Sequence, residues 1–168
     1  LWRLRGPLDI TALRTALGDV VVRHEVLRTR IVQGDGEPIQ RILAVGDTRA
    51  PFRFIVTAEA DSASLIEAEV AHGFDLASDD PIRTTLIELA PRDHLLLLVL
   101  HHAVADGASI APLLSDLARA YAARLAGHAP DFTPLSVSYI DHALWQRARL
   151  DDATEAEQLA YWRTKLAA

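Results

Sequence analysis

The feature that most constrains this chain is a run of six apolar residues, Leu95 to Leu100, which ends directly at two histidines. A strand with one face in water alternates apolar and polar residues, whereas a strand covered on both faces is apolar throughout. The run is far shorter than the ~20 apolar residues of a membrane helix. It therefore predicts the central strand of a sheet with other layers on both faces.

Strand-like and helix-like patterns alternate on either side of this run. Asp9 is a predicted helix N-cap, and apolar residues continue at helical spacing from Ile10 to about Val26. Two β-branched stretches flank a turn composition at 34–37 and predict a hairpin. Strands are predicted over 1–5, 28–33, 38–43, 52–57, 82–89 and 94–101. Helices are predicted over 10–26, 62–72, 110–125, 139–150 and 154–166, and Ser109 is the predicted N-cap of the helix 110–125. This order predicts a mixed α/β fold with a sheet flanked by helices.

Composition excludes several classes of function. The chain has 17 basic and 23 acidic residues and a net charge of −6, which gives no electrostatic footprint for nucleic acid. It has no cysteine, so thiolate nucleophiles, disulfides and Cys-based zinc sites are excluded. With no apolar span or signal core, a cytoplasmic protein with no membrane partner is expected. Neither a metal site nor a cofactor of its own is expected. The chain begins on Leu1 and lacks Met, so we expect an excerpt of a longer polypeptide.

The residues with the clearest chemical potential follow the apolar run, in the stretch from His101 to Gly107. Because side chains alternate along a strand, His101 and His102 are expected to face opposite ways, one into a cavity and one into packing. Asp106 adds a carboxylate, and Gly107 adds a backbone amide without a Cβ, which permits a positive φ or a close approach. The alternative is a structural histidine beside an ordinary Asp-Gly turn, which is the commoner origin of such residues.

The spacing of this stretch resembles the HHxxxDG motif of the chloramphenicol-acetyltransferase-like superfamily. The segment 23–30, Arg-His-Glu-Val-Leu-Arg-Thr-Arg, resembles the RHExLRTxF motif of condensation domains of nonribosomal peptide synthetases, although Arg30 and Ile31 displace its final aromatic region. Weaker likenesses are the segments 74–76 and 81–83 to the FDL and PLR elements, and Tyr139, 143–146 and 161–162 to the helical region after the motif. Residues 1–168 are thereby identified as an N-terminal lobe of a condensation domain, with the C-terminal lobe absent.

The resemblance implies an acyltransferase that forms an amide bond between the acyl group of a donor thioester and the amine of an aminoacyl thioester. His102 is implied as the group that accepts the amine proton or orients the amine, with His101 as its motif partner and the Gly107 amide near the developing oxyanion. Asp106 is implied as structural support through an ion pair with an arginine. Two helical residues five positions apart point about 140° away from each other, so only one of Arg23 and Arg28 is expected to face Asp106, and the resemblance implies that it is Arg23.

The implied partners are upstream and downstream carrier domains bearing 4'-phosphopantetheine, an adenylation domain in the same polypeptide, and the C-terminal lobe. Because the substrate tunnel of this superfamily lies between two lobes, the excerpt alone is not expected to turn over. Three alternatives remain: an epimerisation domain, a stand-alone wax-ester or polyketide-associated acyltransferase, and a non-catalytic recruitment domain. Cyclising relatives carry an aspartate in place of the first histidine, and His101 argues against them. The intact His101-His102 pair favours an active enzyme, because recruitment relatives usually alter the first histidine.

Overall fold

The computed structural model describes residues 1–48, 51–149 and 151–167. The chain divides into two compact units, 1–132 and 133–168, and the first contains the sheets. Its elements are β1 (Trp2–Arg5), α1 (Ile10–Arg23), the 3₁₀ helix η1 (Glu25–Arg28), β2 (Thr29–Gln33), β3 (Pro38–Ile42), β4 (Phe52–Val56), α2 (Glu59–Ala71), β5 (Ile82–Ala90), β6 (Asp93–Leu100) and α3 (Ile110–Leu125). Among the residues described, no helix combines the length and apolar character needed to cross a bilayer.

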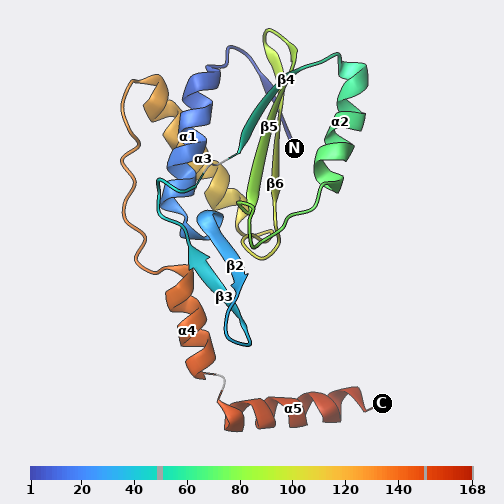
Figure 1. Ribbon diagram of the computed structural model, residues 1–168, viewed down its shortest axis with the longest axis vertical. Coiled ribbons are helices and arrows are strands. Elements are labelled where there is room, and N and C mark those ends of the chain that lie inside the picture. The colour runs from blue at the N-terminus through green and yellow to red at the C-terminus, as the bar shows by residue number, and fades with distance from the viewer. Residues whose placement is uncertain (49–50, 150, 168) are drawn as a thin grey trace. The chain divides into compact units, whose positions relative to one another are not determined.

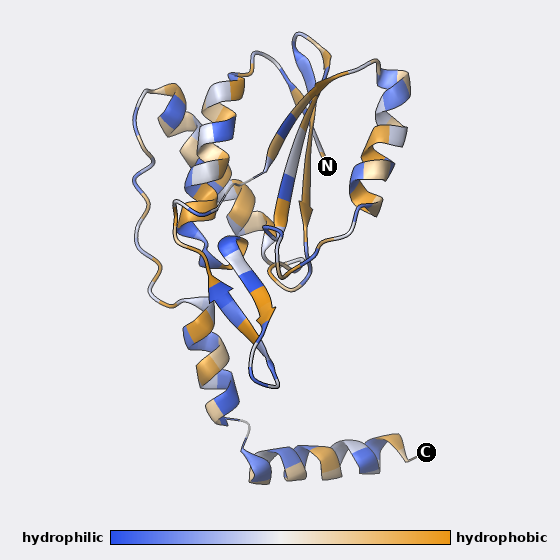
Figure 2. Cartoon of the chain, viewed as in Figure 1, coloured by the Kyte–Doolittle hydropathy of each residue, from blue (hydrophilic) through white to orange (hydrophobic). Residues whose placement is uncertain are grey.

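The main sheet has four strands in the order β1-β6-β5-β4. β6 pairs antiparallel with β1 and β5, while β4 joins β5 in parallel, so the sheet is mixed. The apolar run therefore lies in an interior strand, which confirms the prediction of a central strand. Figure 2 shows the hydrophobic colour along β6.

Helices cover both faces of this sheet, α1 and α3 on one side and α2 on the other (Figure 1). Leu86 and Leu96 are paired in register and belong to the core cluster that also contains Leu17 of α1 and Leu117 of α3. The alternate residues of the same strands point to the other face, where Thr85 donates a hydrogen bond to the Glu69 carboxylate of α2. The predicted mixed α/β architecture with a sheet flanked by helices is confirmed.

Helix α1 begins as predicted and ends earlier than predicted. The Asp9 carboxylate accepts a hydrogen bond of 2.9 Å from the Ala12 backbone N–H and satisfies one of the unpaired amides of the first turn. The helix ends at Arg23 because His24 takes an extended conformation, with φ −100° and ψ 94°. The apolar residues Val26 and Leu27 continue in a separate 3₁₀ turn, so the predicted helix to Val26 is wrong over its last three residues.

The predicted hairpin is confirmed as β2 and β3, which pair antiparallel as a separate two-stranded sheet. Gly36 in its turn has a φ of +99°, a conformation that side chains with a Cβ rarely adopt. The Leu43 N–H beyond β3 donates to the Arg28 carbonyl, which fixes the hairpin at the end of η1.

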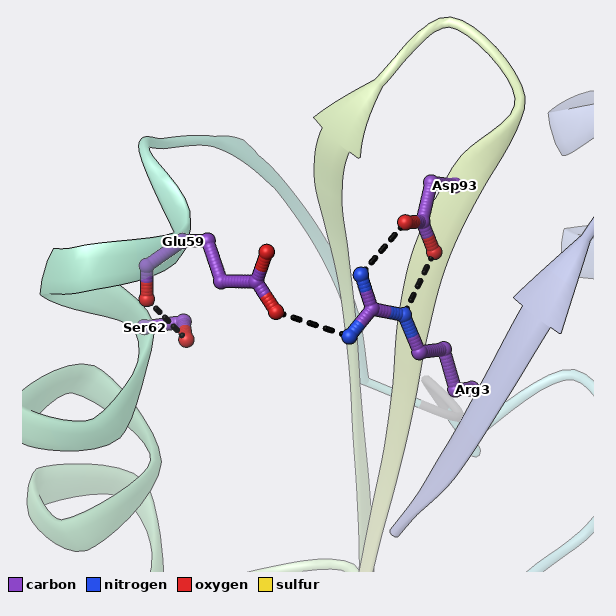
Figure 3. A network of polar contacts seen from close by, with 4 residues as sticks. All are labelled: Arg3, Glu59, Ser62 and Asp93. Atoms are coloured by element: carbon purple, nitrogen blue, oxygen red, sulfur yellow. Dashed lines mark hydrogen bonds and ion pairs between the residues drawn. The ribbon is translucent and has the colours of Figure 1, made fainter.

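A polar network joins three elements at the end of the sheet where β6 begins (Figure 3). The Arg3 guanidinium of β1 donates to both carboxylate oxygens of Asp93, at 2.8 and 2.5 Å, and to Glu59 at 2.7 Å. The pKa of Asp93 is lowered, chiefly by its hydrogen bond from Arg3. Glu59 belongs to the first turn of α2, so this network sets the helix against the strand pair, and α2 starts three residues before its predicted start at Ser62.

The second unit consists of two helices, α4 (Tyr139–Arg149) and α5 (Asp152–Leu166). Asp151 caps α5 by accepting a hydrogen bond of 2.8 Å from the Thr154 N–H. Both predicted helices are present, although Leu150, the predicted end of the first, lies outside the described residues. The aromatic side chains Trp145, Tyr161 and Trp162 are each more than half exposed within the described residues.

Candidate active site

The two histidines lie in a turn directly after β6 and have different surroundings. The His101 backbone N–H donates to the Pro81 carbonyl at 3.0 Å, so the first residue after the strand stays attached to the start of β5. The His101 Nδ1 accepts a hydrogen bond from the Ala103 N–H at 3.0 Å, and its ring meets Phe74 edge to face at 5.9 Å. His102 is exposed to solvent. Of the two histidines, His102 is the more exposed and His101 is half-buried.

A chain of contacts from α2 supports His101, and sequence reasoning missed its central member. The Arg83 guanidinium donates to the carbonyls of Glu69, His72 and Gly73 at the end of α2. Its Cζ also lies 3.8 Å from the centre of the Phe74 ring, which in turn contacts His101. The likeness of residues 81–83 to a family segment was the available signal for Arg83. We infer that α2, Arg83 and Phe74 together hold the first histidine.

Asp106 is held by the start of α3. Its Oδ1 accepts hydrogen bonds from the Ser109 N–H at 2.9 Å and from the Ser109 hydroxyl at 2.7 Å, and its own N–H donates to that hydroxyl oxygen at 3.1 Å. These bonds, that of the Ser109 hydroxyl first, hold the pKa of Asp106 below its usual value. Asp106 and Ser109 thus bond each other reciprocally within the turn that precedes α3. Ser109 precedes the helix as predicted, but its hydroxyl bonds Asp106 and caps no helical amide.

The predicted ion pair between Asp106 and Arg23 is corrected by these contacts. The Arg23 Nε donates to Oδ2 of Asp116 at 2.7 Å, and Arg28 pairs with Glu25 at 3.1 Å and also donates to the Leu43 carbonyl. The physical reason is that α1 packs against α3, which brings its last residue opposite the buried face of α3. Arg28 lies beyond the end of α1, so the helical angle between the two arginines does not apply.

Gly107 does not use the positive φ that the absence of a Cβ permits. The glycines with positive φ in the described residues are Gly6, Gly36 and Gly127. A Cβ built on Gly107 would meet no atom within 4 Å. The fold itself therefore places no demand for glycine at this position, and any need for a bare backbone comes from what approaches the loop.

A buried polar cluster that sequence reasoning missed lies beside the loop. Oδ2 of Asp116 is 2.7 Å from the Arg23 Nε and 2.8 Å from the His24 Nε2, and the aspartate is only 8% exposed. The Arg23 Cζ lies 4.6 Å from the centre of the Phe132 ring. The signal in the sequence was an aspartate at the helical spacing of Leu113, Leu117 and Ala120. A carboxylate on that apolar face needs a cationic partner.

A cavity of about 230 Å³ opens between this cluster and the histidine loop. Its walls come from the junction after α1, from the end of β6 with its loop, and from the first turns of α3: His24, Val26, Leu27, Leu100, Val104, Ala105, Ser109, Pro112 and Leu113. Within the described ranges 1–48, 51–149 and 151–167, no group of three or more His, Asp or Glu side chains is placed to hold a metal ion. The chemistry available at the loop is an exposed imidazole next to a fixed helix start and a largely apolar cavity.

The family model and the similar proteins point to the same family. The family model of the condensation domain matches residues 1–168. The chain is 47% identical over 170 residues to CymA of Salinispora arenicola, which is named as a nonribosomal peptide synthetase, and 47% identical over 175 residues to the isonitrile lipopeptide synthase of Mycobacterium tuberculosis. Each alignment covers 98% of this chain but only 2% and 7% of these relatives, so the chain spans a small part of their lengths.

Among solved structures, the X-domain from teicoplanin biosynthesis superposes with a TM-score of 0.86 at 36% identity. The superposition covers 96% of this chain and 36% of that one. The same X-domain has also been solved in complex with OxyB. The chloramphenicol-acetyltransferase-like fold expected from the sequence is confirmed by this neighbour and by solved condensation domains.

Proposed function

This chain belongs to the condensation domain family, and on that premise we propose that it forms an amide bond between two carrier-bound thioesters in nonribosomal peptide synthesis. The donor is an acyl or peptidyl thioester, and the acceptor is an aminoacyl thioester whose amine attacks. The observation that carries the proposal is the exposed His102 imidazole in an otherwise anchored loop at the end of the central strand. The intact family motif around it supports catalysis over simple binding.

We assign His102 the part of proton acceptor or of orienting group for the amine. When the amine nitrogen attacks the thioester carbon, a C–N bond forms and the C–S bond breaks. The imidazole takes the proton that the nitrogen loses and returns a proton to the leaving thiolate, the kind of transfer that histidine most often performs in general acid–base catalysis. Holding two tethered reactants in contact contributes about 7–11 kcal/mol, so a modest base suffices. The Gly107 N–H is assigned to the developing oxyanion.

Asp106 is assigned a positioning role through the start of α3. Its carboxylate fixes Ser109 and thereby the turn that leads from the histidines into the helix. His101 is likewise a positioning residue, since its ring contacts Phe74 and its Nδ1 accepts the Ala103 N–H. These two residues set where His102 and Gly107 lie, and neither needs to exchange a proton with the substrate.

The chain is proposed to be the first lobe of a two-lobed domain. Its alignment to 36% of the X-domain chain supports this division. The second lobe would supply the other wall of the substrate channel. Carrier domains with 4'-phosphopantetheine would deliver both substrates, and an adenylation domain would load the acceptor. The chain without its second lobe is proposed to be inactive.

Replacing His102 in the full-length protein that carries this sequence tests the proposal. His102→Ala is expected to lower the condensation rate about 10²- to 10⁴-fold, the usual contribution of a positioned base. His128→Ala is the matched control, because this histidine is also exposed and lies beyond the end of α3. Product would be measured by mass spectrometry after loading both carriers. A folded His102→Ala protein that condenses at the unchanged rate would overturn the assignment.

A recruitment function is the second candidate, because the similar X-domain has been solved in complex with another protein, OxyB. The His101-His102 pair counts against it, since recruitment relatives usually alter the first histidine. If the unaltered protein makes no amide with any loaded pair of carriers but binds a tailoring enzyme tightly, the recruitment function replaces the catalytic one. Solvent deuterium entering the α-carbon of a single loaded residue would instead identify an epimerase.

A further inference from the structure

The cavity beside the histidine loop is lined almost wholly by apolar groups and has no part in the proton transfer described above. We infer that it binds an uncharged apolar group, an aliphatic or aromatic side chain or a short acyl chain, of one of the two thioester substrates. This inference rests on the proposed function and adds a preference for substrate size and polarity. It assigns to η1 and to the first turns of α3 a role in choosing the substrate.

The two polar side chains in the wall are already engaged elsewhere. The His24 Nε2 is 2.8 Å from Asp116, and the Ser109 hydroxyl donates to Asp106 and accepts its N–H. A polar or charged ligand group would therefore have to break these bonds or stay unpaired, and an unpaired buried polar group is costly. An apolar group meets no such cost, because the other walls are the hydrocarbon of residues such as Val26, Leu100 and Leu113.

The volume suits a group larger than a methyl. An apolar protein cavity of about 150 Å³ is large enough to bind benzene, and this one measures about 230 Å³. It therefore has room for an aromatic ring or a branched aliphatic chain. A glycyl or acetyl substrate has nothing to place there, and so gains no affinity from the cavity.

The cavity lies within reach of a group that reacts at His102. Leu100 forms part of the wall and stands two positions before His102, so their Cα atoms are at most about 7.6 Å apart. Val104 and Ala105 form another part of the wall and belong to the same loop. Lining residues thus stand two positions before and two positions after His102, so a substrate that reacts at this loop is within a side chain's reach of the cavity.

Val26 is the position at which the inference is best tested, because it lines the cavity, is only half-buried and lies outside the histidine loop. In the full-length protein, Val26→Phe would fill the cavity and Val26→Ala would enlarge it. Condensation is measured with a series of donors from glycyl to leucyl and phenylalanyl against a glycyl acceptor, and then with the series reversed. Val22→Phe in α1 is the matched control, since that valine is 42% exposed and lies outside the cavity.

We expect Val26→Phe to lower kcat/KM for leucyl and phenylalanyl substrates tenfold or more in one of the two series, with glycyl unchanged. Val26→Ala should shift the preference of that series toward larger groups, and it keeps the test open if the phenylalanine variant fails to fold. A response in the donor series would show that the group in the cavity belongs to the donor, and a response in the acceptor series would show that it belongs to the acceptor. Unchanged preferences in both series, with normal glycyl–glycyl condensation, would overturn the inference alone. Loss of all condensation in the unaltered protein would overturn the proposed function and this inference with it.

Discussion

At Gly107 the requirements of the fold can be measured separately from those of the proposed reaction. Its φ is not positive and a Cβ would meet no atom within 4 Å, so alanine fits the folded chain. Alanine also restricts the unfolded chain, and Gly107→Ala is expected to leave the free energy of unfolding unchanged or to raise it by about 0.4–1 kcal/mol. Urea unfolding measures this effect. In the full-length protein the same change should slow condensation if the Gly107 N–H approaches the oxyanion.

Gly36 provides the control for that experiment. Its φ of +99° makes any L side chain strained there, so Gly36→Ala should lower the free energy of unfolding. A Gly107→Ala protein that is destabilised as much as Gly36→Ala would show that the loop has a structural requirement for glycine after all.

The Asp116 carboxylate is the shared polar partner of Arg23 and His24. The aspartate is 8% exposed, accepts the Arg23 Nε–H and contacts His24. Asp116→Ala leaves the Arg23 guanidinium beside the core without this counter-charge, and a cost of about 3–5 kcal/mol in the free energy of unfolding is expected. Asp35→Ala, in the exposed hairpin turn, should change stability by less than about 0.5 kcal/mol. Equal effects in urea unfolding would contradict the structural role of the cluster.

At the scale of elements, the turn from β6 into α3 is coupled to pH through Asp106. The Ser109 hydroxyl and then its N–H lower the pKa of this carboxyl. A lowered folded-state pKa means that the stabilisation is fully present above the ordinary aspartate pKa of about 4 and is lost as the pH falls through the lowered value. Ser109→Ala removes the larger cause, so the pKa of Asp106 should rise toward its usual value.

Carboxyl chemical shifts in an NMR titration measure this change directly. Ser109→Thr keeps the hydroxyl and should keep the pKa of Asp106 low. An Asp106 that titrates at the same pH in the alanine and threonine variants would show that the hydroxyl is not the main cause. The loop would then be anchored by the backbone alone.

The elements that local patterns determine were predictable, and those that long-range contacts determine were not. Asp9 as a cap and the hairpin around Gly36 follow from residues within a few positions of each other. The end of α1 does not, because the apolar spacing continues through Val26 while Arg23 is drawn to Asp116, 93 positions away. The early start of α2 likewise accompanies the pair between Arg3 and Glu59, which no local pattern contains.

The same division applies to the candidate site. The motif located His101, His102 and Asp106 from spacing alone, and the structure places them in one loop. The partner of Asp106 was wrongly predicted as an arginine, because the sequence cannot show which charged groups α1 and α3 bring together. Asp116 and His24 could be recognised only once these two helices were placed against each other.

For the whole molecule, the core of the first unit is made by its own residues. Buried leucines of α1, β5, β6 and α3 form one cluster within 1–132, and α4 and α5 contribute no buried residue in the ranges 139–149 and 151–167. A chain of residues 1–132 is therefore expected to unfold in one cooperative transition in urea, with a near-ultraviolet circular dichroism signal from its packed aromatic side chains.

Leu86→Ala in the shortened chain makes this expectation specific. Leu86 is fully buried in β5, and its truncation should lower the free energy of unfolding by about 2–5 kcal/mol through lost burial and a residual cavity. A broad transition that is insensitive to Leu86→Ala, together with a lost near-ultraviolet signal, would indicate a molten state and a core that needs more of the chain. A cooperative transition that responds to the substitution would show that the sheet, α1, α2 and α3 hold the histidine loop in place by themselves.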